Sequence, residues 1–281
     1  ILIAAMAIQP TPEQLAFQQN SQLSALGFSQ RQPCVQLQPW VQLYWAVQVP
    51  EQADVSQTHA LYPDGGSNLT FDFIPNQLPA VYFQYTQQLS QGCFSAGQHQ
   101  LSVRFHATGA FQLLGISPGE LATEQLDLRL SNLVGLNWLL EQLANNSDLP
   151  TQLTAVECWL LHLAERTITN TSLVQKSLQL LQQPAADLQH LYHQLPKSRR
   201  QFERLFKLET GLSPAQLQLL FKVKLARFLI SKNPLSDLAT VAQQAGFYDQ
   251  AHMHQHFVRI TGQTPGQYKK RKMSQFSNSA A

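Results

Sequence analysis

Two short stretches, Phe206-Lys-Leu-Glu-Thr-Gly-Leu-Ser-Pro214 and Phe257-Val-Arg-Ile-Thr-Gly-Gln-Thr-Pro265, follow one pattern at a distance of 51 residues. Phenylalanine, threonine, glycine and proline stand at matching places in both copies. A duplication of this size predicts two similar small folds in tandem. The register extends backward along the chain, so each copy is predicted to form a helix, a tight turn and a second helix. In the helix-turn-helix plan, the first helix braces the second, whose exposed face enters the major groove of DNA.

Charge is divided unevenly along the chain. Residues 184–273 hold 14 Lys and Arg against 5 Asp and Glu, a net charge of +9, whereas residues 1–183 hold 5 against 12, a net charge of −7. Cations that neutralise phosphates release condensed counterions, so a basic domain favours a polyanionic partner. A charge run is more often only a solvated surface, but here it coincides with the duplication. The sequence therefore predicts that the basic region binds nucleic acid and that the acidic remainder does not.

The length of 281 residues predicts two domains. The three cysteines, Cys34, Cys93 and Cys158, are widely spaced, which supports neither a disulfide framework nor a thiolate zinc site, and we expect buried free thiols. The apolar stretch from Ile1 to Ile8 lacks a basic segment before it and is too short to span a bilayer. We expect a soluble, cytoplasmic protein that makes no membrane contact.

The front part of the chain is predicted to be mainly sheet. Between about Gln32 and Arg104 the apolar residues alternate with period two, which is typical of half-buried antiparallel strands. Turn residues separate them at Pro63-Asp64-Gly65-Gly66 and at Pro75-Asn76. A helix is expected to start at Thr11-Pro12 before the sheet. We expect a closed barrel or a sandwich whose strands carry Val41, Leu43, Trp45 and Val47, then Leu69, Phe71 and Phe73, then Val81, Phe83 and Tyr85, then Leu101, Val103 and Phe105.

From about Asn132 the apolar period changes to 3.6, which predicts helices that link the sheet to the basic region. Their apolar stripes serve either the core of one chain or contact with a second copy, and the sequence leaves both open. The predicted fold is α+β with two domains. We expect a β-rich sensor or dimerisation domain over residues 1–128, a helical linker over 129–183, a DNA-binding domain over 184–273 and a tail over 274–281.

The first helix predicted to enter DNA runs from its N-cap, Ser198, to about Glu209, and Gly211 ends it. Arg200, Glu203, Arg204 and Lys207 share its outward face. Two arginines one turn apart suit bidentate contact with guanine or a clamp on phosphate. The alternative is a surface ion pair between Glu203 and one of Arg200, Arg204 or Lys207.

A capping box at Ser213-Pro214 opens a helix that Asn233-Pro234 ends. About 18 residues make a strut of roughly 27 Å, which suits two reading helices near successive major grooves about 34 Å apart. In the second unit, Ser236 and Asp249 are the expected caps. Its outward residues are predicted to be Ala251, His254, Gln255 and Val258, with Gln250 and His252 alongside.

The second face holds no fixed positive charge, so we expect weaker and pH-dependent binding from this half. His252, His254 and His256 invite a metal interpretation, but only His252 and His256 share a helix face. His190 with His193 is subject to the same objection. No phosphate-binding loop, nucleophile elbow or zinc-protease motif is present in the sequence, and we expect no catalytic residue, metal or cofactor.

The stretch Gly246-Phe-Tyr-Asp-Gln-Ala-His-Met-His-Gln-His-Phe257, followed by Thr261-Gly-Gln-Thr-Pro265, closely resembles the C-terminal signature of AraC/XylS-family bacterial transcription regulators. The resemblance covers about residues 184–273. The resemblance implies DNA contacts from residues at matching positions of both units: Arg200, Glu203 and Arg204 in the first, and Gln250, Ala251, His252, His254 and Gln255 in the second. We expect neighbouring residues to complete the interface: Ser198, Arg199, Lys207 and Asp249. Gln255 stands where members often place arginine, and His256 replaces a usual acidic or small residue.

The front part, with Pro33 to Trp45 and Pro63-Asp64-Gly65, is similar to a β-rich domain of some AraC-like regulators that is related to cupin-like sensor domains. A catalytic cupin needs a metal set of His-x-His and glutamate, which His59, His99 and His106 do not form. Alternation alone makes the aromatic residues of these strands core, but they are also candidates for an effector pocket: Trp40, Trp45, Phe71 and Phe73.

These observations predict a sequence-specific, double-stranded-DNA-binding transcription regulator without enzymatic activity. The resemblance implies a small-molecule effector, RNA polymerase and a second copy of the chain as further partners. A rival from another class is a DNA-repair alkyl-acceptor joined to the same DNA-binding fold, which requires a reactive thiolate beside a cysteine-rich metal site. A metal-dependent cupin enzyme is the second rival.

Overall fold

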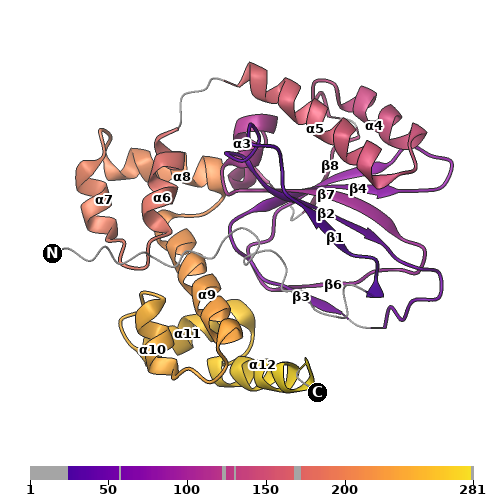
Figure 1. Cartoon of the computed structure of the whole chain (residues 1–281). Helices are drawn as coiled ribbons and strands as arrows, with labels where there is room; N and C mark the ends of the chain where they lie inside the picture. The colour runs from indigo at the N-terminus through magenta and orange to yellow at the C-terminus, as the bar shows by residue number, and fades with distance from the viewer. Residues whose placement is uncertain (1–24, 57, 122–124, 130, 168–171, 280–281) are drawn as a thin grey trace.

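The computed structural model describes residues 25–56, 58–121, 125–129, 131–167 and 172–279. The helix start expected at Thr11 lies outside them. A β-rich N-terminal region and a helical C-terminal region pack against each other (Figure 1). This is the α+β, two-domain fold that the sequence predicts.

The N-terminal region is built on an open antiparallel sheet of six strands in the order β1-β2-β7-β4-β5-β8, with β3 and β6 forming a separate two-stranded sheet. Because β1 and β8 are edges that do not meet, the sheet is not a closed barrel, and the arrangement is sandwich-like. The strands are β1 (Ser29–Arg31), β2 (Val41–Gln48), β3 (His59–Leu61), β4 (Ser67–Phe73), β5 (Ala80–Gln84), β6 (Ser90–Gly92), β7 (His99–Phe105) and β8 (Gln125–Asp127).

The period-two pattern identified the four long strands, and in β4, β5 and β7 the predicted residues pack in or against the main core. In β2 the pairing register shifts between Val41 and Leu43, so Tyr44 and Ala46 enter the main core, whereas the predicted Val47 lies in a second cluster. Phe71, Phe83 and Val103 have no exposed surface in the main core. A smaller cluster on Val47 and Val49 includes residues before β1 and after β6. The sheet is therefore apolar on both faces.

Helices α4 (Leu136–Asn145) and α5 (Leu149–Arg166) lie together over the sheet, beside the short α3 (Gly109–Leu114) (Figure 1). A 3-10 turn, η1 (Pro118–Glu120), follows α3. Trp159 anchors α5, since its ring is buried and its indole N–H donates to the carbonyl of Val134 at 2.8 Å. The predicted 3.6-residue periodicity is confirmed here.

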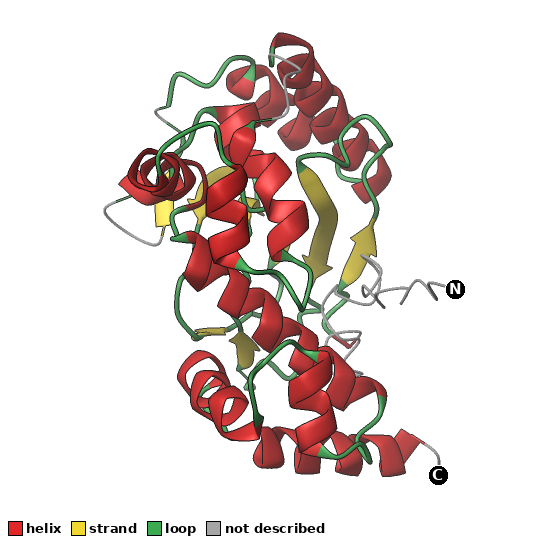
Figure 2. Ribbon diagram, turned by 90° about the vertical axis from the view of Figure 1, so that its left-hand side faces the viewer, coloured by secondary structure: helices red, strands yellow, loops and turns green. Residues whose placement is uncertain are grey.

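The C-terminal region holds seven helices among the described residues: α6 (Leu173–Leu181), α7 (Leu188–Gln194), α8 (Arg199–Thr210), α9 (Pro214–Lys232), α10 (Leu238–Gln244), α11 (Gln250–Thr261) and α12 (Pro265–Ser279). The two views show α9 running from the group of α6, α7 and α8 to the group of α10, α11 and α12 (Figures 1 and 2). At 19 residues, α9 measures about 28 Å, as the strut prediction requires.

One cap differs from the prediction. The N-cap of α10 is Asp237 rather than Ser236, and its carboxylate accepts the N–H groups of Ala239 and Thr240. A carboxylate can accept from two amides and interacts favourably with the helix dipole, which explains why it is the better cap. Within the described residues no helix combines the length and the apolar character needed to cross a bilayer.

Candidate nucleic-acid interface

Helices α8 and α11 are structural duplicates. Each has 12 residues, begins after a side-chain N-cap and ends at a left-handed glycine, Gly211 with φ 75° and Gly262 with φ 70°. Thr210 and Thr261 each donate a side-chain hydrogen bond of 2.7 Å to the carbonyl four residues back. The repeated sequence pattern therefore encodes one helix-and-stop unit twice.

The caps also follow the prediction. Ser198 and Gln201 form a reciprocal capping box at the start of α8, and Asp249 accepts the backbone N–H of His252 at 2.7 Å at the start of α11. Capping satisfies amides that the first turn of a helix otherwise leaves unpaired. Both helices thus begin at defined residues.

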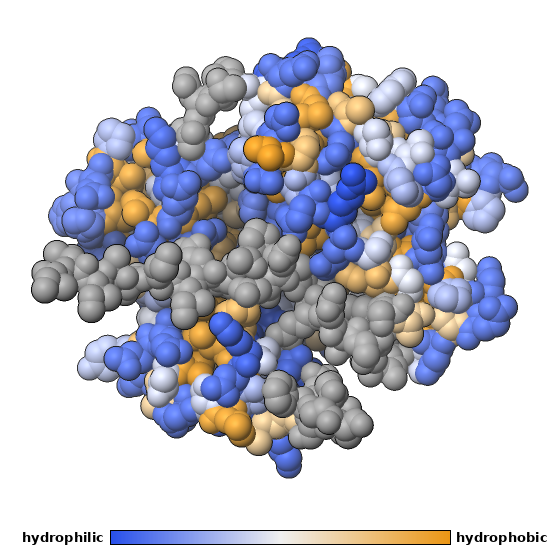
Figure 3. All heavy atoms as spheres, viewed as in Figure 1, coloured by the Kyte–Doolittle hydropathy of each residue, from blue (hydrophilic) through white to orange (hydrophobic). Residues whose placement is uncertain are grey.

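The two helices bury matching apolar stripes and leave the opposite face open. Phe202 and Phe206 of α8 correspond to Met253 and Phe257 of α11, and all four side chains have no exposed surface. The outward positions of α8 carry the exposed cations Arg199, Arg200, Arg204 and Lys207. The outer rim around α7 is also mainly hydrophilic (Figure 3).

The ion pair on α8 uses a different arginine from those that the alternative reading named. Arg199 donates to Glu203 at 2.9 Å and lies over the ring of Tyr192, and the Tyr192 hydroxyl donates to the same Glu203 oxygen at 2.9 Å. Hydrogen bonds from Arg199 and Tyr192 lower the pKa of Glu203. Among the described residues Arg200, Arg204 and Lys207 form no ion pair, so their charge is available to a ligand.

The face of α11 is neutral and partly aromatic. Gln250, Ala251, His254 and Gln255 are exposed. His252 is half-buried, because its ring packs edge-on against Phe247 and lies 4.6 Å from the ring of His256, and its Nδ1 lies 3.4 Å from the Tyr248 amide. His252 therefore braces the helix start, while the other four predicted residues lie on the open side.

Two residues beside this face were missed by sequence reasoning. Tyr248 precedes the N-cap of α11 and is 92% exposed. Arg259 lies one turn beyond Gln255, is exposed and forms no ion pair among the residues described. A large aromatic residue next to a helix N-cap, and a single arginine in the last turn, were the available sequence signals.

The basic run on α12 faces the N-terminal region in part. Lys269 donates to the carbonyl of Ser236 at 2.7 Å, and Arg271 lies 3.4 Å from the hydroxyl of Tyr62. Burial, with Arg271 and Arg227 nearby, lowers the pKa of Lys272 to about 8. Part of the net positive charge of this region is therefore engaged within the molecule.

An ion cluster joins the two regions and was not predicted. Asp64, in the loop before β4, accepts hydrogen bonds from Arg104 of β7 and, at 2.9 Å, from Lys224 of α9. Although burial alone raises the pKa of Asp64, these two cations hold it well below its ordinary value. The three side chains are only 17–18% exposed, so we name them the Asp64 cluster and regard them as a buried charge network.

The N-terminal region also caps the end of α8. The Tyr85 hydroxyl donates to the carbonyl of Thr210 at 2.7 Å, and the Ser117 hydroxyl donates to the carbonyl of Leu208 at 2.8 Å. The last turn of a helix leaves such carbonyls without internal partners. Side chains of the N-terminal region therefore complete the C-terminal end of α8.

A second contact reaches the other helix-turn-helix unit. The ring of Tyr62 lies 3.6 Å below the guanidinium of Arg227 on α9, and its hydroxyl accepts from Gln263, just beyond α11, at 3.0 Å. One loop, from Tyr62 to Gly66, thus touches the strut and the far unit. Both helix-turn-helix units therefore contact the N-terminal region.

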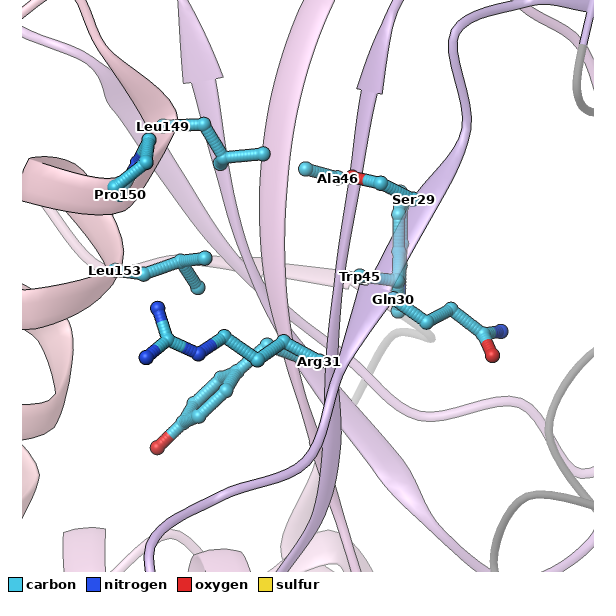
Figure 4. A pocket seen from close by; sticks show the side chains of 9 residues that line it. Ser29, Gln30, Arg31, Trp45, Ala46, Leu149, Pro150 and Leu153 are labelled. Carbon is cyan, nitrogen blue, oxygen red and sulfur yellow. The ribbon is translucent and has the colours of Figure 1, made fainter.

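Two hollows lie on the N-terminal region. The smaller, of about 240 Å³, has Leu149, Pro150 and Leu153 of α5 facing β1 and β2, with Arg31 at one end (Figure 4). The larger, of about 630 Å³, lies where the turn between β4 and β5 meets the corner between α4 and α5. Each hollow includes one of the predicted aromatic residues, Trp45 in the smaller and Phe73 in the larger.

The other two aromatic candidates have structural contacts. Phe71 is fully buried in the core, and Trp40 packs against the core with its N–H donating to Gln112 at 2.8 Å. The expectation of buried thiols is wrong, because Cys93 and Cys158 are exposed and Cys34 is half-buried. Within the parts of the chain that the structure describes, no three His, Cys, Asp or Glu side chains are placed to hold a metal ion.

The comparisons with known proteins agree with the duplicated helices. Residues 191–271 match the family model described as a helix-turn-helix domain. The C-terminal region is an AraC-type helix-turn-helix domain. Residues 29–127 match a domain of unknown function, DUF6597, which lies in front of the AraC-type domain. No curated protein sequence matches the chain significantly.

Structures of ToxT from Vibrio cholerae are among the solved structures that match the chain. One form shares 10% sequence identity, with 86% of this chain and 98% of that chain covered and a TM-score of 0.40. The structure bound to (E)-4-(8-methylnaphthalen-1-yl)but-3-enoic acid shares 11% identity, covering 87% and 99%, with a TM-score of 0.40. The wild-type form bound to an unsaturated fatty acid shares 11%, covering 86% and 94%, with a TM-score of 0.38.

Proposed function

We propose that this protein is a transcription regulator that binds one asymmetric site on double-stranded DNA through α8 and α11, under the control of a ligand or partner of its N-terminal region. The AraC-type domain supports DNA binding. The observation that carries the proposal is the pair of duplicate helices with open outward faces, one of which holds three cations without an ion pair.

The two faces suit different tasks. Arg200 and Arg204 lie one turn apart, which suits a guanine edge. Lys207 lies about one turn beyond Arg204, and its single charge suits a phosphate. Gln250 and Gln255 suit an adenine edge, and His254 suits either a base or a phosphate. We therefore assign most of the affinity to α8 and additional sequence selection to α11.

Control by the N-terminal region is proposed to pass through the Asp64 cluster and the Tyr62 contact. Both hold α9, which sets the distance between the two reading helices. We retain residues 184–273 as the proposed DNA-binding domain and add α6, since it packs against α8 and α9. RNA polymerase and a second copy of the chain are further proposed partners, and we propose that the protein acts in the bacterial cytoplasm.

The test is fluorescence anisotropy of the full chain with DNA fragments selected from a random pool. Arg204→Ala is expected to relax preference at one base position and to cost about 1–3 kcal/mol, whereas Lys207→Ala weakens all sequences alike and lowers the salt slope by about 1. Arg129→Ala is the matched control, because Arg129 is an exposed arginine on the N-terminal region. Binding that depends on neither salt nor sequence contradicts the proposal.

A further inference from the structure

The larger hollow, which we call the corner pocket, is walled by three separate parts of the chain. The ends of the paired strands β4 and β7 supply Phe73 and His99, and the turn after β4 supplies Ile74 and Leu78. The corner between α4 and α5 supplies Leu143 and Gln152. Its volume of about 630 Å³ lies within the range of small-molecule sites. None of its lining residues belongs to the duplicated helix-turn-helix units.

Its rim is unusually apolar for a surface turn. Ile74 is 39% exposed and Leu78 is 54% exposed, although both are large aliphatic side chains. Beside them the rings of Phe73 and His99 stack with centroids 4.1 Å apart and planes 16° apart. Aliphatic and aromatic groups gathered around a hollow favour a ligand with an apolar or aromatic face.

One polar group in the wall lacks a partner. Gln152 is 1% exposed, and its Nε2 donates to the carbonyl of Asn146 at 2.8 Å, which fixes the amide. Its Oε1 has no hydrogen-bond partner. Because nearly all buried polar groups are hydrogen-bonded, an orphaned acceptor in a pocket wall favours a ligand that brings an N–H or O–H group.

The pocket offers no charge to a ligand. Asp, Glu, Lys and Arg are all missing from its lining. Burial lowers the pKa of His99, although Asp72 opposes the shift, so the site favours the neutral imidazole. A charged group placed here loses hydration without gaining a counter-ion, which disfavours both anions and cations.

We propose that the corner pocket binds an uncharged small molecule that has an aromatic or apolar face and at least one hydrogen-bond donor. The face lies against the stacked rings of Phe73 and His99 and the side chain of Leu78. The donor pairs with the Gln152 amide oxygen, which is sealed from solvent in the unbound structure, so binding must displace the side chains that cover this atom. The assignment of the corner pocket as the effector site rests on the proposed function.

A path of contacts connects the pocket with the first reading helix. The pocket borders the start of α5, and at the far end of α5 the Thr167 hydroxyl lies 3.4 Å from the carbonyl of Gln112. The Gln112 side chain contacts Ser172, whose hydroxyl donates to Glu209 of α8 at 2.9 Å. A ligand that shifts the α4–α5 corner therefore acts on an element that contacts the support of α8.

Ligand-observed NMR of the full chain tests the assignment without DNA, so its failure is separate from failure of DNA binding. The probes are benzyl alcohol, which is neutral and carries a donor, anisole, which lacks the donor, benzoate and benzylamine. We expect benzyl alcohol to bind best. Leu78→Glu is expected to weaken it about tenfold or more, because the added carboxylate must lose hydration. Leu126→Glu is the matched control, since Leu126 is 39% exposed on β8 and does not line the pocket.

Gln152→Leu tests the donor contact, and it should remove the preference for benzyl alcohol over anisole. The proposal is overturned if benzyl alcohol does not bind at millimolar concentration, if benzoate or benzylamine binds equally well, or if benzyl alcohol binds Leu78→Glu as tightly as the unmodified chain. Loss of binding in Leu153→Glu with retention in Leu78→Glu also overturns it and assigns the probe to the smaller pocket of Figure 4.

Discussion

Replacing Asp64 by alanine removes the only carboxylate among the described residues that pairs with both Arg104 and Lys224. It also removes the carboxylate oxygen that accepts a hydrogen bond from the Gly66 amide at 3.1 Å. Two cations that are 18% exposed then lie close together without a counter-ion. Removing one partner of a buried ion pair typically costs about 3–5 kcal/mol, because the remaining charge is poorly hydrated. We expect a loss of this size in the free energy of unfolding.

The assay is urea unfolding of the full chain at pH 7, followed by tryptophan fluorescence. Asp127→Ala is the control, because the exposed Asp127–Arg129 pair should contribute little. A double variant, Asp64→Ala with Lys224→Met, should recover part of the loss, since it removes one of the two uncompensated cations. If Asp64→Ala unfolds at the same urea concentration as Asp127→Ala, the Asp64 cluster does not hold the two regions together.

The pH dependence of the cluster follows from its direction of shift. The folded-state pKa of Asp64 is depressed, so the stability it contributes is present above its unfolded-state value of 3.8 and is lost as pH falls toward the lower folded value. Between pH 5 and pH 8 this contribution is constant. A change in stability within that window must come from other groups.

Three further predictions concern single side chains. Burial and nearby cations lower the pKa of His106 from 6.5 to about 4, so below pH 6.5 the unfolded chain binds a proton that the folded chain does not. The free energy of unfolding should therefore fall by about 2 kcal/mol from pH 7 to pH 5. In urea titrations, His106→Asn should flatten this pH dependence. Gly246→Ala should destabilise the protein by more than about 2 kcal/mol, because the φ of Gly246 is 80° and an added Cβ would lie 2.0 Å from a backbone oxygen. Gly115→Ala is the control and should cost about 1 kcal/mol, because Gly115 has a φ of 70° but open space around it. Equal losses of the two variants in thermal unfolding contradict the prediction. Tyr248→Ala should weaken DNA binding several-fold in anisotropy titrations and leave the melting temperature unchanged, because its side chain is 92% exposed; unchanged affinity removes Tyr248 from the interface.

The sequence predicted the reading helices well because their determinants are local. The cap, the buried stripe and the left-handed glycine of α8 all lie between Ser198 and Gly211, and the same features recur 51 residues later. Each feature acts within one or two helical turns, so a single sequence contains it. The strand pattern of the front region is local in the same sense.

The Asp64 cluster could not be predicted in this way. The loop around Asp64 was interpreted as a turn with a glycine at positive φ, and Gly65 has a φ of 82° there. The ionic partners of Asp64, however, lie 40 and 160 residues further along the chain. Periodicity and capping carry no information about contacts at that separation. The orientation of Arg271 toward Tyr62 was hidden for the same reason, so the net charge of the basic region overstated the charge available to DNA.

The pairing of Glu203 was missed for a different reason. Arg199, Arg200, Arg204 and Lys207 are all within four residues of it, and spacing alone does not choose among them. The choice depends on Tyr192, which belongs to the preceding helix and holds both Arg199 and Glu203. A neighbour from another element thus decides which cations remain open.

The unequal charge of the two reading faces gives the strut a functional consequence. The face of α11 lacks an unpaired cation at its predicted contact positions. In the proposed complex with DNA, binding through α11 therefore depends on the effective concentration that α9 provides once α8 is bound. A rigid spacer of matching length maximises that concentration, and a loosened one lowers it without touching either face. The N-terminal region holds α9 at Lys224 and Arg227. Weakening these contacts should therefore first remove the contribution of the half-site read by α11, and only a larger change should release the half-site read by α8.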